Sequence, residues 1–345
     1  MRRTQPTLKP ISSQLMHQPG IEPGSVPWQG LKESEGERTK PLQEMAIPVT
    51  RMMVPHARPS LRLSHPNLPN PSRVNFLCRC APSELQPLRA ELSLSVGIHA
   101  IPHPDKVEKG GEDAFFVSSY RGGVMAVADG VSGWAEQDVD PSLFSKELMA
   151  NASRLVDDEE VRYDPGFLID KAHTATTSRG SATIILAMLE EVGILKIGNV
   201  GDCGLKLLRQ GQIIFATTPQ EHYFDCPYQL SSEGSAQTFL DASFSIVEVQ
   251  KGDVIVMGSD GLFDNVFDHE IVSIVTKHTD VAESSRLLAE VASSHSRDTE
   301  FESPYALEAR AKGFDVPLWK KVLGKKITGG KLDDVTVIVA KVVSS

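Results

Sequence analysis

Residues 181–216, SATIILAMLEEVGILKIGNVGDCGLKLLRQGQIIFA, decide the fold class. They contain four strand-like apolar runs, at 181–189, 194–200, 204–209 and 212–216. Turn signals separate runs at Glu191–Gly193 and at Gln210–Gly211. Parallel neighbours need long crossover connections, so strands this close in sequence are expected to pair antiparallel.

The flanking sequence adds further strands and pairs of helices. Asp140 and Pro141 combine an N-cap with a proline at the first helical position, and apolar residues then recur on one face. The other expected elements are strands at 114–120, 124–128, 244–249, 253–258 and 335–342, helices at about 165–177, 269–277 and 281–295, and an irregular stretch before the last strand. We therefore expect an α+β fold, an antiparallel β-sandwich of two sheets flanked by helices on both outer faces.

Residues 1–80 differ in composition from the rest of the chain. They contain 12 of the 22 prolines, and 11 Lys+Arg against 5 Asp+Glu. We expect residues 1–80 to be disordered and residues 81–345 to form one folded domain. Subtracting +6 from the total of −10 leaves −16 for that domain, and this charge disfavours nucleic acid as a partner. No apolar run approaches the ~18 residues of a membrane-spanning helix, so we expect no transmembrane segment.

Residues 45–80 have the composition of an organelle-transit peptide. They include five arginines among Ser, Thr and Pro, and no acidic residue. A disordered basic tail would have the same composition. Met45-Ala46 resembles the usual start of a chloroplast transit peptide, however, and Leu77–Ala81 resembles a plastid processing site. We therefore predict a chloroplast protein that is cleaved close to Ala81.

Four acidic clusters stand at the ends of expected strands. They are GGEDA at 110–114, VADG at 127–130, GSDG at 258–261 and KLDDVT at 331–336. Singly, an Asp-Gly pair favours a turn and a Glu-Asp pair a solvated face. Together, carboxylates at the mouth of an apolar sandwich repel one another and lose hydration unless a cation compensates. Mn²⁺ or Mg²⁺ would do so, and two such ions can hold a hydroxide for attack on phosphorus.

These clusters, in this order, are similar to the motifs of the metal-dependent protein phosphatases (PPM, the type 2C serine/threonine phosphatases). GSAT at 180–183 and NVGD at 199–202 match further motifs of that family. The resemblance covers roughly residues 95–343. It implies a four-layer α/β/β/α catalytic domain with two or more Mn²⁺ or Mg²⁺ ions in a cleft between the sheets. It also implies hydrolysis of phosphoserine or phosphothreonine by direct attack of metal-bound hydroxide.

The resemblance also implies individual site residues. They are Asp129, Gly130, Asp260, Asp333, Glu112 and Asp113. Asp129 would bridge both ions, and the Gly130 carbonyl would bind one of them. Asp260 and Asp333 would complete the ligand set of the second ion, and Glu112 and Asp113 would hold metal-bound water. Asp202 is left between two roles, fixing a strand turn or binding metal.

Two positions depart from the family's pattern. The phosphate-gripping arginine, four positions before the glutamate, is Glu108 here, and the histidine two residues after the bridging aspartate is Val131. Lys106 is the candidate phosphate-binding replacement, although a solvated loop lysine would have the same sequence. The missing arginine leaves open a phosphoprotein-binding pseudophosphatase. The retained carboxylates favour an enzyme with different phosphate contacts.

Further matches point to the branch of the family that serves plastids and mitochondria. HPDK at 103–106 and SPYA at 303–306 carry this resemblance together with GKLDD at 330–334. The plastid members of the branch imply phosphorylated photosystem II core subunits as substrates, reached at the thylakoid surface from the stroma. Another organellar phosphoprotein is the alternative. We expect the protein to be a monomer.

Overall fold

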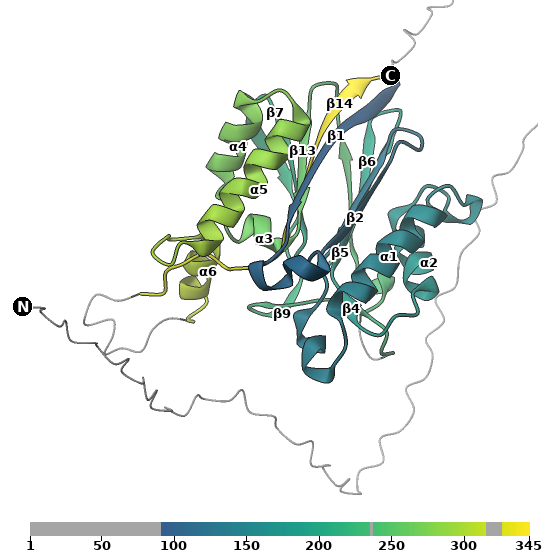
Figure 1. The fold of residues 1–345 in the computed structure, drawn as a ribbon. Helices are drawn as coiled ribbons and strands as arrows, with labels where there is room; N and C mark the ends of the chain where they lie inside the picture. The colour runs from purple at the N-terminus through teal and green to yellow at the C-terminus, as the bar shows by residue number, and fades with distance from the viewer. Residues whose placement is uncertain (1–90, 235–236, 315–325) are drawn as a thin grey trace, which may run out of the picture. The chain divides into compact units, whose positions relative to one another are not determined.

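A computed structural model describes residues 91–234, 237–314 and 326–345, to which all elements below belong (Figure 1). The segment predicted to be disordered, 1–80, and the predicted cleavage site at Ala81 lie outside these ranges. No helix within them is long and apolar enough to cross a membrane.

Two five-stranded antiparallel sheets form the centre of this part of the chain. The β14 sheet has the order β1 (Leu92–Ile101), β14 (Val335–Ser344), β13 (Val254–Gly258), β7 (Gly204–Arg209) and β8 (Gln212–Ala216). The β5 sheet has the order β12 (Ser243–Glu248), β6 (Ile194–Val200), β5 (Ile184–Glu190), β3 (Val124–Ala128) and β2 (Ala114–Ser118). The antiparallel pairing predicted from residues 181–216 is confirmed.

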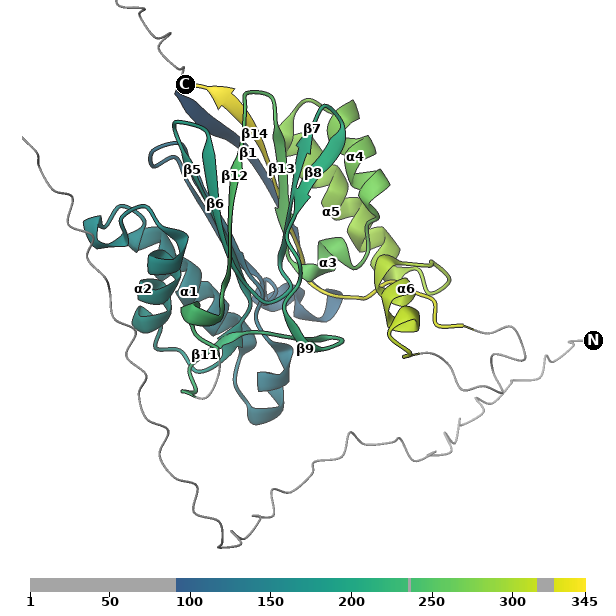
Figure 2. The ribbon, with the colours of Figure 1, turned by 180° about the vertical axis from the view of Figure 1, so that it is seen from behind.

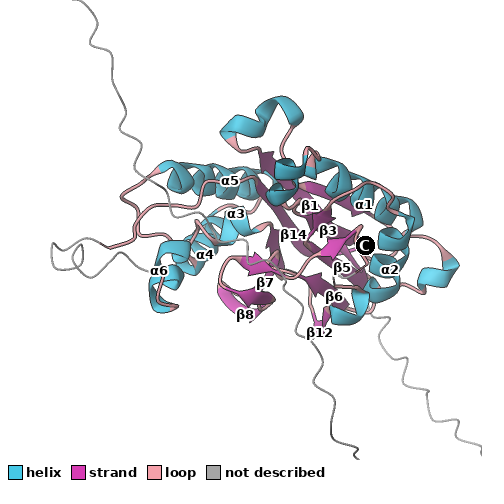
Figure 3. Ribbon diagram, turned by 90° about the horizontal axis from the view of Figure 1, so that it is seen from below, coloured by secondary structure: helices cyan, strands magenta, loops and turns pink. Residues whose placement is uncertain are grey.

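Helices cover the outer face of each sheet (Figures 1 and 2). On the β5 sheet lie α1 (Pro141–Leu155) and α2 (Pro165–Ala175). On the β14 sheet lie α4 (Asp268–Lys277) and α5 (Val281–Arg297). Figure 3 looks along the sandwich and shows the strands between these two groups of helices. The predicted four-layer arrangement is therefore confirmed.

Side chains from both faces of the central strands are buried. In β5, Ile184 and Leu186 pack beneath α1 and α2, whereas Ile185 and Leu189 face the other sheet. Successive side chains of a strand point to opposite faces, so a strand covered on both sides needs an apolar residue at every position. This requirement explains the continuous apolar runs in the sequence.

The sequence analysis missed β1. This strand pairs with β14 along its whole length, with Leu92 opposite Ser344 and Ile101 opposite Val335. At Gly97 the N-terminus of α5 comes so close that a Cβ would lie 2.4 Å from the backbone nitrogen of Ala282. Glycine is therefore needed where α5 crosses β1.

Two other predicted segments need correction. The stretch expected to be irregular contains α6 (Pro304–Ala311), whose N-cap Ser303 accepts a hydrogen bond from the Ala306 N–H. The strand expected at 181–189 is divided into β4 (Ser181–Ala182) and β5, because the Thr183 N–H donates to the Asp129 carbonyl instead of to the sheet. The other predicted elements agree with the observed ones to within a residue or two at their ends.

Short elements connect the strands. The two-residue strand β4 pairs with β11 (Leu230–Ser231), and β9 (Glu221–Tyr223) forms a hairpin with β10 (Cys226–Pro227). The remaining helical segments are α3 (Asp260–Phe263), η1 (Pro104–Lys109), η2 (Ser132–Gln137), η3 (Glu159–Val161) and η4 (Phe239–Asp241). Figures 1 and 2 both show β9, α3 and α6 at the same end of the sandwich.

Candidate active site

The strand register brings the predicted site residues to one end of the sandwich. Asp113 directly precedes β2 and Asp129 directly follows β3, and these strands pair with Ala114 opposite Ala128. In the other sheet, Asp260 begins α3 just after β13, and Asp333 stands just before β14, the strand paired with β13. Residues more than 200 positions apart in sequence are thereby placed together.

Burial and mutual repulsion raise the pKa values of these carboxyl groups. Burial raises the pKa of Asp129 well above its ordinary value, and the charges of Asp113, Asp260 and Asp333 raise it further. Burial, followed by the charge of Asp334, raises the pKa of Asp113 to about 8. Burial and the charge of Asp260 raise the pKa of Asp333 to about 6. The carboxyl groups of Asp113, Asp129, Asp260 and Asp333 thus form one electrostatically coupled cluster, the acidic unit, which a cation would stabilise.

Several carboxylate oxygens in this unit have no hydrogen-bond partner although they are buried. They are Oδ1 of Asp113, Oδ1 of Asp202 and Oδ1 of Asp260. Such oxygens are costly in a protein interior unless a donor or a cation satisfies them. Oxygen donors are also what Mg²⁺ and Mn²⁺ prefer, so the donor chemistry fits these ions. Burial and the charge of Asp260 raise the pKa of Asp202, which makes it part of the unit rather than only a turn residue.

The carboxyl groups do not stand in a complete metal-binding arrangement. Among the residues the structure describes, no three His, Cys, Asp or Glu side chains converge on one point closely enough to hold an ion. Two lysine ammonium groups, from Lys106 and Lys331, pair with members of the unit. Ion binding would therefore require the carboxylates to come closer together than they stand here.

Lys106 lies within this acidic unit. Its Nζ is 2.6 Å from Glu112 Oε2, 3.3 Å from Asp334 Oδ2 and 3.7 Å from Asp333 Oδ1. Burial disfavours the charged form of Lys106, but the hydrogen bond to Glu112 and the other carboxylates outweigh burial and raise its pKa. The ammonium is therefore charged and lies near the predicted metal ligands, a position from which it can contact a substrate phosphate. Its phosphate-binding role stays a prediction.

Two serines that the sequence analysis did not single out hold predicted site residues. Ser132 Oγ donates to Glu112 Oε2 at 2.5 Å, and Ser259 Oγ donates to Asp113 Oδ2 at 2.8 Å. The Gly130 N–H donates to the Glu112 carbonyl at 3.2 Å. The loop before β2 is thus attached to both sheets. Serines this common give no sequence signal for such a role.

Asp334, for which the sequence analysis names no role, joins the loop before β2 to the start of β14. Its Oδ1 accepts from the His103 N–H at 2.7 Å, and its Oδ2 accepts from the Glu112 N–H at 2.9 Å. Asp334 is only 2% exposed. Gly111 has φ +80°, and a Cβ there would lie 2.5 Å from Asp334 Oδ1. Asp334 therefore positions the segment that carries Lys106.

Lys331 also received no role from the sequence, although it stands in the last acidic motif. Its Nζ lies 2.6 Å from Asp260 Oδ2 and 3.0 Å from Asp264 Oδ2. Burial disfavours its charged form, but the charges of Asp260 and Asp264 outweigh this effect and raise its pKa. Asp264 was not predicted either. Only the folding of α3 onto the end of β14 places it beside the lysine.

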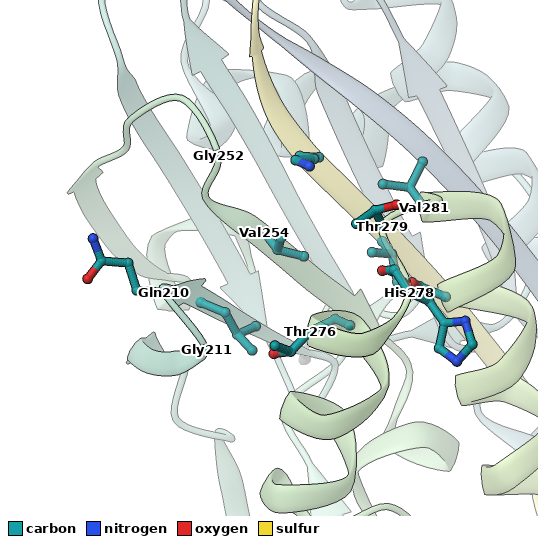
Figure 4. A pocket seen from close by; sticks show the side chains of 13 residues that line it. Gln210, Gly211, Gly252, Val254, Thr276, His278, Thr279 and Val281 are labelled. Atoms are coloured by element: carbon teal, nitrogen blue, oxygen red, sulfur yellow. Dashed lines mark hydrogen bonds between the residues drawn. The ribbon is translucent and has the colours of Figure 1, made fainter.

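A separate pocket lies away from the acidic unit (Figure 4). It is bordered by the β7–β8 turn at Gln210 and Gly211, by Val254 and by the α4–α5 turn at His278. Val254 begins β13, whereas Asp260 follows the other end of that strand. No carboxylate lines the pocket. We therefore do not regard it as the candidate active site.

Known proteins resemble the chain over most of its length, although no family model matches it. Probable protein phosphatase 2C 26 of Arabidopsis thaliana is 96% identical over 301 residues, which cover 87% of this chain and 100% of that protein. Probable protein phosphatase 2C 1 of Oryza sativa subsp. japonica is 60% identical over 284 residues, covering 81% of this chain and 86% of that protein. The X-ray structure of the photosystem II phosphatase PBCP has a TM-score of 0.71 and 62% sequence identity, over 72% of this chain and 98% of that one.

Proposed function

Because the chain belongs to the protein phosphatase 2C family and is a serine/threonine protein phosphatase, we propose that the acidic unit is its catalytic centre. We further propose that two or more Mn²⁺ or Mg²⁺ ions bind there. The observation that carries this proposal is the set of buried carboxylate oxygens without hydrogen-bond partners, on side chains whose pKa values are raised by burial and by one another.

The proposed ligands are the residues that the motifs predicted. Asp129, Asp260 and Asp333, with the carbonyl of Gly130, would hold the ions, and Glu112 and Asp113 would complete the ligand set through water. Divalent ions, when bound, neutralise phosphate charge and generate a nucleophile from water at neutral pH. The chain itself supplies a positive charge at Lys106 and hydroxyl groups that orient the carboxylates.

Hydrolysis is proposed to proceed without a covalent phosphoenzyme. The thiol of Cys203 lies close enough to Asp129 to feel its charge. This thiol is buried, and its pKa is raised well above normal, first by burial and then by the Asp129 charge. A thiol held in its protonated form is a weak nucleophile. Alkylation of thiols should therefore leave most of the activity, whereas EDTA should abolish it. A trapped phosphocysteine would contradict direct hydrolysis.

Asp129→Asn tests the metal proposal with two independent measurements. The variant should lose most phosphatase activity on a phosphothreonine peptide and should bind fewer Mn²⁺ ions in equilibrium dialysis. In EDTA it should unfold at a higher temperature than the wild type, because a buried, repelled charge is gone. Asp138→Asn is the matched control, since this aspartate is exposed and its φ of +57° suits asparagine. Near-normal turnover by Asp129→Asn at saturating Mn²⁺ would refute the role of Asp129 as a metal ligand.

Lys106 is proposed to bind the substrate phosphate. Lys106→Ala should raise KM for a phosphopeptide while the number of bound Mn²⁺ ions stays unchanged. Lys109→Ala is the control, because the Lys109 side chain is 65% exposed and pairs only with Asp140 among the described carboxylates. If both variants change KM equally, the lysine at 106 has no special role in phosphate binding.

We propose phosphorylated photosystem II core subunits in the chloroplast as the substrates. The support is the likeness to the photosystem II phosphatase PBCP, together with the acid-free, arginine-bearing composition of residues 45–80. Added protein should remove phosphate from the core subunits of isolated thylakoids more rapidly than from other phosphoproteins. Loss of phosphate only from other organellar proteins would favour the alternative substrate. Capture of phosphoproteins without phosphate release would favour the pseudophosphatase.

The working enzyme is proposed to begin close to Ala81. All proposed ligands lie beyond this residue, so a protein that starts at Ala81 should hydrolyse phosphopeptides as well as the full chain does. A fusion of residues 45–85 to a fluorescent reporter tests chloroplast targeting separately. Import into mitochondria, or retention in the cytosol, would refute the chloroplast proposal without affecting the phosphatase activity. Gel filtration of the Ala81 protein would test the predicted monomer.

A further inference from the structure

The ammonium group of Lys331 lies among three carboxylates from two separate segments of the chain. Besides Asp260 at 2.6 Å and Asp264 at 3.0 Å, it contacts Oδ1 of Asp225 at 3.0 Å. Asp225 belongs to the β9–β10 hairpin, Asp260 begins α3, and Asp264 follows α3. The lysine side chain is only 20% exposed. One cation therefore joins the hairpin to the acidic unit.

The backbone of Lys331 is held in place by one buried side chain. Asn265 Oδ1 accepts from the Lys331 N–H at 2.9 Å, and Asn265 Nδ2 donates to the Lys331 carbonyl at 2.8 Å. The same Nδ2 donates to the Gly261 carbonyl at 2.9 Å, and Asn265 is completely buried. Exposed lysine pairs contribute little because the side chain must be ordered for each contact. Here the buried asparagine fixes where the lysine side chain begins.

The hairpin has its own contacts with α6, which place Asp225 over the lysine. Phe224 packs against Tyr305 and Phe314 with ring centroids 5.2 Å apart in each case. The Tyr305 hydroxyl donates to Asp225 Oδ2 at 3.3 Å, and the lysine ammonium lies 5.4 Å from the centre of the Tyr305 ring. The hairpin is thus positioned by stacking on one side and by Lys331 on the other.

We propose that the Lys331 ammonium is a tethered cation, which takes the place of a divalent ion between Asp225, Asp260 and Asp264. The hairpin is then held against the acidic unit whether or not metal is present. This inference rests on the proposed function, namely that the neighbouring carboxylates bind Mn²⁺ or Mg²⁺. The three carboxylates offer the oxygen donors that divalent ions prefer, but with the ammonium between them they do not converge closely enough to hold an ion. Without the ammonium, a divalent ion could draw the three side chains together.

A second observation separates the tethered cation from an ordinary ion pair. Asp260 gives Oδ2 to Lys331, whereas its Oδ1 is buried without any partner. One carboxylate therefore has one oxygen on the tethered cation and one left for an ion. The lysine occupies one side of Asp260, so ions of the catalytic centre are confined to the other. On this basis Lys331 is a positioning residue that sets how many ions the site accepts.

The number of bound Mn²⁺ ions tests the proposal. Lys331→Met removes the ammonium group and keeps an unbranched side chain that is one atom shorter, and we expect it to bind one more ion per chain than the wild type in equilibrium dialysis. Lys312→Met is the matched control. The Lys312 ammonium also connects the hairpin to α6, with Glu221 and Glu308 each at 2.7 Å, but its ion pairs are outside the acidic unit. It should leave the number of ions unchanged.

Further variants show where the additional ion binds. Asp225→Asn in the Lys331→Met background should remove it, because one of its three carboxylates is lost. Lys331→Arg keeps a positive charge and should bind the same number of ions as the wild type. If Lys331→Met binds no more Mn²⁺ than the wild type, the tethered cation is refuted. If the wild type binds no Mn²⁺ at all, the proposed function fails, and Lys331→Met still reports separately on the lysine.

Hydrogen exchange tests the same proposal in the wild type, should Lys331→Met not fold. Exchange of the amides at 223–226 in the hairpin should change little between Mn²⁺ and EDTA, because the lysine holds the hairpin in both. Acceleration in EDTA by about tenfold or more would show that the hairpin depends on bound metal and would overturn the proposal. In Lys331→Met that acceleration is the expected result.

Discussion

Asp334 offers a stability test in which charge and hydrogen bonding can be separated. Its carboxylate accepts from two backbone N–H groups, of His103 at 2.7 Å and of Glu112 at 2.9 Å, in a site that is 2% exposed. Asp334→Ala removes both acceptors. Asp334→Asn removes the same negative charge but keeps one oxygen, so one of the two N–H groups retains its acceptor, while the Nδ2 group faces the other N–H and offers it none.

The expected magnitudes follow from these contacts. A buried donor without an acceptor costs roughly 1–3 kcal/mol, so Asp334→Ala, which leaves both N–H groups without one, should lose at most one such increment more than Asp334→Asn, whose Nδ2 also lacks an acceptor. Both variants relieve the repulsion between Asp334 and Asp113 equally, and that contribution cancels in the comparison. We therefore expect a difference of up to about 2 kcal/mol in the free energy of unfolding between the two variants. For a domain of this size, this corresponds to roughly 4–8 °C in Tm.

Urea unfolding in EDTA, followed by tryptophan fluorescence, measures the difference without contributions from bound metal. The expected order of stability is Asp334→Asn above Asp334→Ala, with the same dependence on urea concentration for both. The wild type, which keeps the repulsive charge, serves as the reference. Equal stability of the two variants would show that the His103 and Glu112 N–H groups do not depend on the carboxylate, and the positioning role of Asp334 would be abandoned.

Three further predictions concern the stability of the domain. Tyr163→Phe should lose about 1–2 kcal/mol in urea unfolding, because the buried hydroxyl donates to the Leu189 carbonyl at 2.6 Å, and an unchanged midpoint would contradict this. Gly97→Ala should lose roughly 1–3 kcal/mol by crowding α5, with a wild-type Tm as the contrary result. The pKa values of Asp113, about 8, and Asp333, about 6, are raised, so the folded chain binds protons more tightly than the unfolded chain. Tm in EDTA should therefore fall as the pH rises from about 4 to about 8, and Mn²⁺ should reverse the fall.

The fold and the family could be predicted because their signals are local. Strands with apolar residues on both faces, such as the one at 184–190, give continuous runs, and short turns between them require antiparallel pairing. The family prediction from the acidic motifs is confirmed by the relatives. The strand register places Asp260 near Asp333 in one sheet and Asp129 near Asp113 in the other, and the packing of the two sheets brings these pairs together. Their roles as metal ligands stay predictions.

The missed residues act through contacts that no local pattern encodes. Lys331 forms an ion pair with Asp225, which lies 106 positions earlier in the sequence (331 − 225). A lysine that is near aspartates in sequence is commonly a solvated charge, so its motif gave no sign of this contact. Asp334 received no role from its motif, because its acceptor role depends on the distant His103 backbone. The strand β1 was missed because its half-buried residues alternate with Ser and Gly, a weaker signal than a continuous run.

The place of β14 in its sheet determines when the domain can assemble during synthesis. Leu92 pairs with Ser344, so the ribosome must add 252 residues, given by 344 − 92, before β1 has a partner. The β5 sheet is complete once residue 248 has emerged, whereas β13, which can already pair with β7, lacks its second neighbour until β14 is made. Until then, two unpaired strand edges and the apolar face beneath α5 are open to chaperones or to other nascent chains. A chain that stops before residue 335 would remain in that state, with its first sheet complete and its second reduced to β13, β7 and β8, without β14 and with β1 unpaired.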